Sequence, residues 1–165
     1  MKKYLQIVDR HKASLGTRFV NNFIDTIILL IINFILSFIS AVIYNVTFIH
    51  FFYFYNNGGF LWNVFMGSVF GFVYFFFWEN FTDGRTPGKY ITGTKVISTD
   101  GKKPTTRQIV SRSLYRLIPF EAFTFFGTDG WHDSMTDTRV INYKNYESER
   151  QLKDEINSIG VKETA

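Results

Sequence analysis

Asp25 is a carboxylate inside an apolar run, and it is the residue of this sequence best placed to do chemistry. The run covers residues 19–44 and carries no other formal charge. A charge in hydrocarbon costs about 2.5–3.5 kcal/mol on insertion scales, so a buried carboxylate needs a partner, a proton or a task. Seven residues make almost two helical turns, so Arg18 falls on nearly the same face. The residues of this stripe, polar except for one leucine, are Arg18, Asn22, Asp25, Leu29 and Asn33.

Three interpretations of Asp25 stay open from the sequence. It forms a structural ion pair with Arg18, with Asn22 as a bridge, because about 10 Å of helix axis separates the two residues. It pairs with a cytoplasmic base such as Lys89 or Arg112. Or it is a cation or proton site whose affinity depends on its charge.

Two segments have the length and composition of membrane-spanning helices, for which about 20 apolar residues suffice. They are residues 19–44 and residues 60–78, and the second contains no charged side chain. Basic residues outnumber acidic ones in segments 1–18 and 79–121, whereas segment 45–59 has none of either. The positive-inside rule then predicts a multi-pass protein of the cell membrane, with the N-terminus and segment 79–121 in the cytoplasm. Segment 45–59 becomes an external loop, and the spans an antiparallel transmembrane hairpin.

Gly67 and Gly71 lie four residues apart in the second span. Small residues at this spacing let the backbone of another helix approach closely. Because a short loop joins the spans, we expect these glycines to pack against the first span rather than form a dimer.

Turn signals and β-branched residues predict a small cytoplasmic β-ribbon. One strand is expected at residues 90–98, ahead of the turn Asp100-Gly101, and its partner at residues 138–143. A two-stranded ribbon is marginal in water, so this one should lean on a helix or on the membrane surface. Residues 1–146 then form a single domain of a mainly α membrane protein. Residues 147–165 are charged and mixed in sign, which indicates a flexible tail.

The pattern of residues 105–127 predicts an interfacial or re-entrant helix. Ile109, Leu117 and Phe120 are spaced for one helical face and two arginines lie on another, a pattern typical of a helix whose apolar face enters the headgroup region. Its purely apolar part is too short to span a bilayer. A full crossing would also bury two arginines and a glutamate.

The segment after the second span contains two glycines and a lysine. It lacks the spacing of a phosphate-binding loop, because Tyr90 follows the lysine. We interpret it as a tight turn at the membrane surface, where Arg85 and Lys89 contact anionic lipid headgroups or an acidic partner. Its residues are Gly84, Arg85, Thr86, Pro87, Gly88 and Lys89.

No other pattern of residues in the sequence indicates a metal site, a cofactor site or a catalytic site. His132 and Asp133 lie near further carboxylates but without a second histidine, so we expect Asp133 to cap a helix or to pair with a base such as Arg112. The chain has no cysteine, and no Ser-His-Asp set or carboxylate pair is evident. Its net charge of +4 lies in segments that flank the spans, which favours a membrane partner over nucleic acid.

These motifs together resemble the RDD family of membrane proteins. Arg18 and Asp25 match the arginine and the aspartate of the family's first span. Residues 84–89, a strand and an Asp-Gly turn are similar to its motif after the second span. Arg112 resembles the arginine of the next helix, and the pair His132-Asp133 resembles the element that carries the last aspartate.

The resemblance covers about residues 13–142 and implies a membrane fold. It also implies transport, since cation–proton exchange has been attributed to a member. Our leading hypothesis is a component for transport of a cation or small solute coupled to protons. Asp25 would be the in-membrane site, Arg18 its electrostatic regulator, and Asp133 with Arg112 a cytoplasmic gate pair.

The competing hypothesis is a membrane scaffold or accessory subunit whose polar residues only hold the fold. Two spans cannot enclose a pathway, so the transport hypothesis needs a homo-oligomer, a membrane partner protein or the segment 105–127. The other expected partners are the bilayer and its anionic headgroups.

Overall fold

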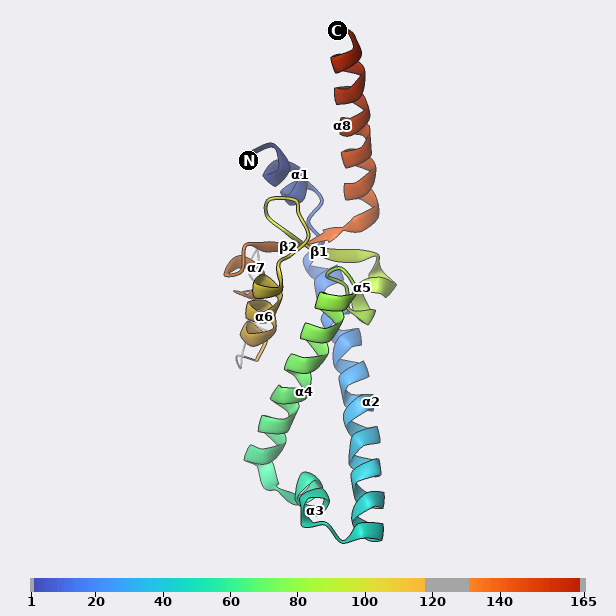
Figure 1. The fold of residues 1–165 in the computed structure, drawn as a ribbon, viewed down its shortest axis with the longest axis vertical. Coiled ribbons are helices and arrows are strands. Elements are labelled where there is room, and N and C mark those ends of the chain that lie inside the picture. The colour runs from blue at the N-terminus through green and yellow to red at the C-terminus, as the bar shows by residue number, and fades with distance from the viewer. Residues whose placement is uncertain (1, 118–130, 164–165) are drawn as a thin grey trace.

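The computed structural model describes residues 2–117 and 131–163, and this part of the chain is mostly helical (Figure 1). In chain order its elements are α1 (Lys2–Arg10), α2 (Leu15–Thr47), α3 (His50–Asn57), α4 (Gly59–Phe81), α5 (Pro87–Thr92), β1 (Thr94–Ser98), α6 (Thr106–Tyr115), α7 (Trp131–Ser134), β2 (Thr138–Asn142) and α8 (Tyr143–Glu163).

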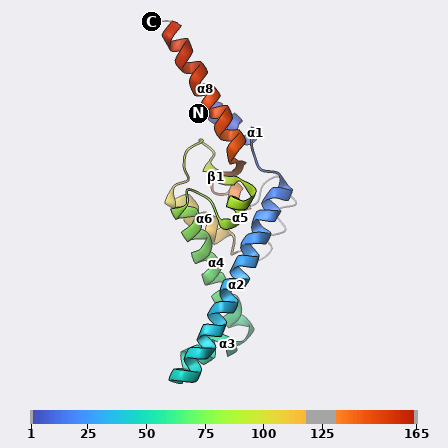
Figure 2. The ribbon, with the colours of Figure 1, turned by 90° about the vertical axis from the view of Figure 1, so that its right-hand side faces the viewer.

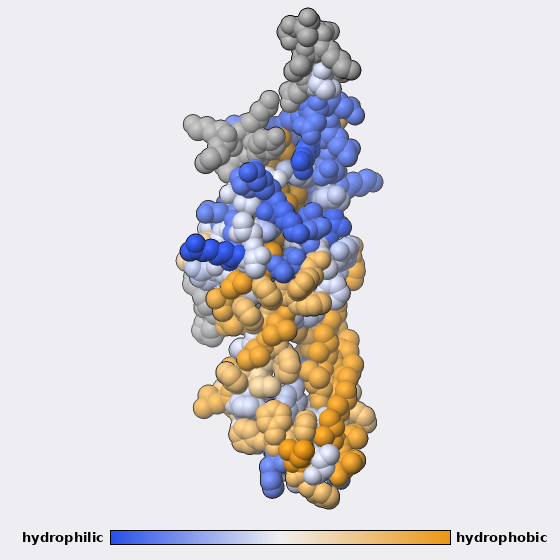
Figure 3. Space-filling model, viewed as in Figure 1, coloured by the Kyte–Doolittle hydropathy of each residue, from blue (hydrophilic) through white to orange (hydrophobic). Residues whose placement is uncertain are grey.

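Within the described residues two helices, α2 and α4, are long and apolar enough to cross a membrane. Only 6% and 17% of their most apolar windows are buried in protein, so most of their side chains face outward. The core helix of a soluble protein would bury its apolar side chains. Figure 3 shows the apolar surface at the end that holds α2, α3 and α4, and the hydrophilic surface at the other end. The prediction of two helices of spanning length is therefore confirmed.

The connection between the two long helices is itself helical, so the loop predicted for segment 45–59 is wrong. α3 contacts the far ends of both α2 and α4. Two serines of α2 hold it in place, since Ser40 Oγ donates to the Phe52 carbonyl (3.0 Å) and Ser37 Oγ to Asn56 Oδ1 (2.6 Å). The expected packing of Gly67 and Gly71 against the first span is also wrong, because a Cβ built on either meets no atom within 4 Å.

The predicted β-ribbon is present. β1 and β2 pair antiparallel with Val96 opposite Val140. β1 begins four residues later than predicted because the chain first forms α5, which Gly93 ends at a φ of 68°. The ribbon leans on helices, as expected. Its apolar core against α1 and α8 consists of Ile7, Val8, Ile97, Ile141 and Tyr146.

The charged C-terminal segment is a helix rather than the disordered tail that we expected. α8 extends away from α2, α3 and α4 in both views (Figures 1 and 2). Its first turns are anchored, because Tyr146 is buried and Glu149 accepts from Arg10 Nη1 (2.9 Å) and contacts His11 Nε2 (2.5 Å). These tertiary contacts supply the stability that the composition alone does not indicate.

α6 differs from the predicted interfacial helix. It begins at a capping box between Thr105 and Gln108. It packs against α4 with Ile109 and Arg112 both buried, so the arginine-bearing face points into the protein rather than toward water. Residues 118–127 of the predicted segment lie outside the described residues, and a re-entrant continuation stays a prediction.

Candidate functional site

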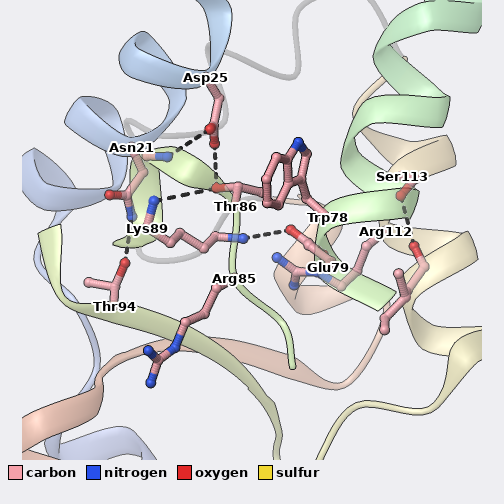
Figure 4. Close-up of polar contacts among 12 residues, drawn as sticks. Asn21, Asp25, Trp78, Glu79, Arg85, Thr86, Lys89, Thr94, Arg112 and Ser113 are labelled. Carbon is pink, nitrogen blue, oxygen red and sulfur yellow. Dashed lines mark hydrogen bonds and ion pairs between the residues drawn. The ribbon is translucent and has the colours of Figure 1, made fainter. Parts of the chain in front are cut away.

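Charged side chains from α2, α4, α5 and α6 lie close together inside the protein, among them Asp25, Glu79, Lys89 and Arg112 (Figure 4). Fully buried charges are rare in proteins unless they are paired. Because each of these side chains is at most 4% exposed, their partners decide what the cluster can do. This buried polar network consists of Arg18, Asp25, Glu79, Lys89, Arg112 and Asp133.

Asp25 accepts three hydrogen bonds, all from neutral donors. Tyr74 Oη (3.0 Å) and the Gly88 amide (2.9 Å) donate to Oδ1, and Thr86 Oγ1 donates to Oδ2 (2.6 Å). A carboxylate offers about four acceptor positions, so one position on Oδ2 stays open as far as the described residues go. Among the described residues no lysine or arginine forms an ion pair with Asp25.

The segment after α4 is built to receive the Asp25 carboxylate. Thr86 is the N-cap of α5 and Pro87 takes its first position, which turns the free amide of Gly88 toward Asp25. A Cβ on Gly88 would lie 2.4 Å from the Asn21 carbonyl oxygen and 3.1 Å from the Asp25 carboxylate. Only glycine permits this approach. The predicted surface turn is therefore an internal contact between α5 and α2.

Glu79, at the end of α4, binds three cations. Its carboxylate contacts Lys89 Nζ (2.5 Å), Arg112 Nε (3.0 Å) and Arg116 Nη2 (3.2 Å). Burial lowers the pKa of Lys89 to about 8, although the Glu79 carboxylate opposes that shift. Since Lys89 is paired inside the protein, it does not make the headgroup contact expected from the sequence.

Arg112 joins Glu79 to Asp133. Its Nη1 contacts both Asp133 Oδ1 and the Thr138 hydroxyl, so the structure brings together the predicted pair of Arg112 and Asp133. Burial alone would lower the pKa of Arg112, but the two carboxylates outweigh it and raise that pKa. Arg18 Nη1 lies 3.7 Å from Asp133 Oδ2, so among the described residues Arg18 pairs with Asp133 and not with Asp25.

The remaining residues that the sequence suggested for the site make contacts other than those expected, or lie outside the described side chains. The Arg85 guanidinium lies 4.1 Å from the centre of the Tyr143 ring, which is a cation–π contact, and its contact with lipid headgroups stays a prediction. Asn22 lines the cavity beside Asp25 but, among the described residues, does not bridge Arg18 and Asp25. Its neighbour Asn21 links α2 to the ribbon, since Asn21 Nδ2 donates to Thr94 Oγ1 (2.9 Å). Gly84 makes a close approach to β1, because an added Cβ would lie 2.6 Å from the Val96 carbonyl oxygen. The side chain of His132 lies outside the described ones.

Sequence reasoning missed three members of the site: Asn21, Tyr74 and Glu79. Glu79 carried a usable signal, because it is the first charged residue after the second span and precedes a run of bases. Tyr74 carried none, since it is one of many aromatic residues in that span.

A small cavity opens beside Asp25. Its free volume is about 20 Å³, which is room for one water molecule or one small ion. The described residues hold no group of three or more histidines and carboxylates that would bind a metal ion. The cavity is lined by Arg18, Asn21, Asn22, Asp25, Lys89, Arg116 and Val140.

Comparison with known proteins identifies one family. The family model described as "RDD family" matches residues 12–139, which is most of the chain and includes every member of the buried polar network. No curated protein and no solved structure matches the chain.

Proposed function

Because this chain belongs to the RDD family of membrane proteins, we propose that it is a component for transport of a cation or small solute coupled to protons, with Asp25 as the site. The observation that carries the proposal is the set of Asp25 partners. They are neutral, whereas the nearby bases pair with Glu79 and Asp133. A buried carboxylate that no cation contacts offers a negative charge to a small species that enters beside it.

The cavity beside Asp25 supports the same proposal. It has room for one small species, and Asp25 Oδ2 keeps an acceptor position. Arg18, Lys89 and Arg116 also line the cavity, so their positive charges weaken the affinity of the site for a cation unless they stay paired with Glu79 and Asp133. No covalent chemistry is expected of this site.

Two helices cannot enclose a route across a bilayer. The proposal therefore includes a homo-oligomer or a partner membrane protein. It also places the N-terminus and segment 79–121 on the cytoplasmic side of the cell membrane, where the exposed basic residues of both segments, such as Lys102 and Arg107, meet anionic headgroups.

A structural role for Asp25 is the second candidate, and one observation favours it. The donors to Asp25 come from α4 and from the turn into α5, so the carboxylate ties three helices together. In that case the protein is a scaffold or an accessory subunit.

Flux through liposomes separates the two candidates. Purified wild type and Asp25→Asn would be reconstituted, and pH and cation movement followed with entrapped dyes. Asp83→Asn is the matched control, since Asp83 is an exposed carboxylate that pairs with Lys103. We expect flux in wild type and in Asp83→Asn, and none in Asp25→Asn.

Three results would count against transport through Asp25. Wild type that moves no ion rejects the transport proposal. Asp25→Asn that is folded and carries normal flux rejects Asp25 as the site. Asp25→Asn that loses its melting transition, while Asp83→Asn keeps it, supports the structural role.

A further inference from the structure

A second cavity lies in the apolar half of the molecule, far along α2 from Asp25. It opens between α2, α3 and α4 and has a free volume of about 250 Å³, which exceeds the space of several water molecules. Its lining residues are Asn33, Ser37, Tyr55, Asn56, Asn63, Met66 and Gly67.

The lining is polar but uncharged. Five of the seven side chains carry an amide or a hydroxyl, and none is an acid or a base that is ionised at neutral pH. Two of the helices that bear them, α2 and α4, are mostly apolar and are little buried in protein. A polar surface inside a hydrocarbon layer must be matched by hydrogen-bonding groups, because lipid tails offer none.

Part of this hydrogen-bonding capacity is used within the protein. Ser37 Oγ donates to Asn56 Oδ1 (2.6 Å), and Tyr55 Oη donates to Asn33 Oδ1 (3.1 Å). The amide nitrogen of Asn33 and the whole amide of Asn63 have no hydrogen-bond partner among the described residues. Donors and acceptors therefore face the cavity together.

We propose that this cavity binds a small uncharged solute with several hydrogen-bonding groups, of the polyol or amide class. An ion would find no counter-charge in the lining. A lipid tail would leave both amides unpaired. Gly67 keeps the α4 side of the cavity open, because it places no side chain there. The site is separate from Asp25 and does not depend on the transport proposal.

A cysteine placed at the cavity wall tests the proposal without removing an amide. Gly67→Cys is suitable, since a Cβ there meets nothing within 4 Å and the chain has no native cysteine. Val69→Cys is the matched control, because it lies two residues on and points to the opposite side of α4. Both variants would be placed in nanodiscs and treated with N-(2-hydroxyethyl)maleimide.

We expect Gly67→Cys to react at least tenfold faster than Val69→Cys, since the reaction needs a hydrated thiolate. Glycerol and urea should slow that reaction at least threefold, whereas choline and acetate at equal osmolarity should not. Adding Asn33→Leu and Asn63→Leu should abolish the protection. Adding Asp25→Asn should leave it unchanged, even where that substitution abolishes ion flux.

Three outcomes would overturn the proposal. Equal rates at the two cysteines mean that lipid fills the cavity. Equal protection by charged and uncharged solutes, or none by any, means that the cavity has no selective site. Spontaneous disulfide formation between Gly67→Cys chains means that a second copy of the chain occupies it.

Discussion

At the scale of single residues, the buried polar network depends on close approaches that tolerate little change. Gly88 brings its amide to Asp25 at 2.9 Å, and Glu79 holds three cations. A single substitution at Gly88 or at Glu79 disturbs these contacts directly, so its effect on the stability of the protein can be predicted.

Gly88→Ala should destabilise the protein by about 1–3 kcal/mol, the usual cost of overpacking. The added methyl would lie 2.4 Å from the Asn21 carbonyl oxygen, so α5 must move away from α2. Gly71→Ala is the control, because its Cβ meets nothing within 4 Å and alanine favours a helix. Thermal unfolding in detergent measures both variants, and equal melting temperatures would show that Gly88 does not hold α5 against α2.

Glu79→Gln should cost about 3–5 kcal/mol, because it leaves buried cations without their carboxylate. The double variant Glu79→Gln/Lys89→Met should be more stable than the single one, since it also removes a buried charge that lost its partner. Denaturant unfolding of the two variants compares them. A double variant less stable than Glu79→Gln would mean that Lys89 contributes through other contacts.

At the scale of elements, the joint between α1 and α8 carries the clearest dependence on pH. Hydrogen bonds from Lys153, one turn further along α8, and from His11, next to α1, hold the pKa of Glu149 at about 2, below its usual 4.5. Arg10 of α1 adds its charge, so His11 and Arg10 supply the part of the shift that crosses the joint. A carboxyl whose pKa is lowered by folding stabilises the folded form above its unfolded pKa. That contribution fades as the pH falls from about 4.5 through 2.

We therefore expect α8 to loosen from α1 as the pH falls through this window. Spin labels at Gln6 and Arg150 would report it as a broader distance distribution at low pH. Glu149→Gln should be broad at neutral pH as well, whereas Glu155→Gln should behave as wild type because Glu155 is exposed. A distribution that stays narrow at pH 2 would mean that apolar packing alone holds α8.

At the scale of the whole molecule, the two long helices and the ribbon were predictable because each has a local signal. Hydropathy over residues 19–44 and 60–78 and β-branched residues near Val96 and Val140 are visible in the sequence. Helix α3 and the first turns of α8 were not, since contacts such as Ser40 to Phe52 and His11 to Glu149 join distant residues.

The sequence indicated which residues belong to the site better than it indicated which of them form ion pairs with one another. Arg18, Asp25, Lys89, Arg112 and Asp133 stood out as charges beside apolar helices, and all five are buried. Their pairing depends on how α5 and α6 dock, which no spacing within one helix determines. Glu79 pairs with Lys89 and Arg112, the two bases that we had assigned to Asp25. The Asp25 carboxylate therefore accepts hydrogen bonds from neutral donors only.

In the topology that we propose, the chain crosses the bilayer twice and the buried polar network lies at the cytoplasmic end. Single cysteines at Asn57 and Arg150 test it most directly, because the chain has none of its own. In intact cells an impermeant thiol reagent should label Asn57→Cys and leave Arg150→Cys unlabelled until the membrane is opened. External labelling of Arg150→Cys, or protection of Asn57→Cys, would contradict this topology.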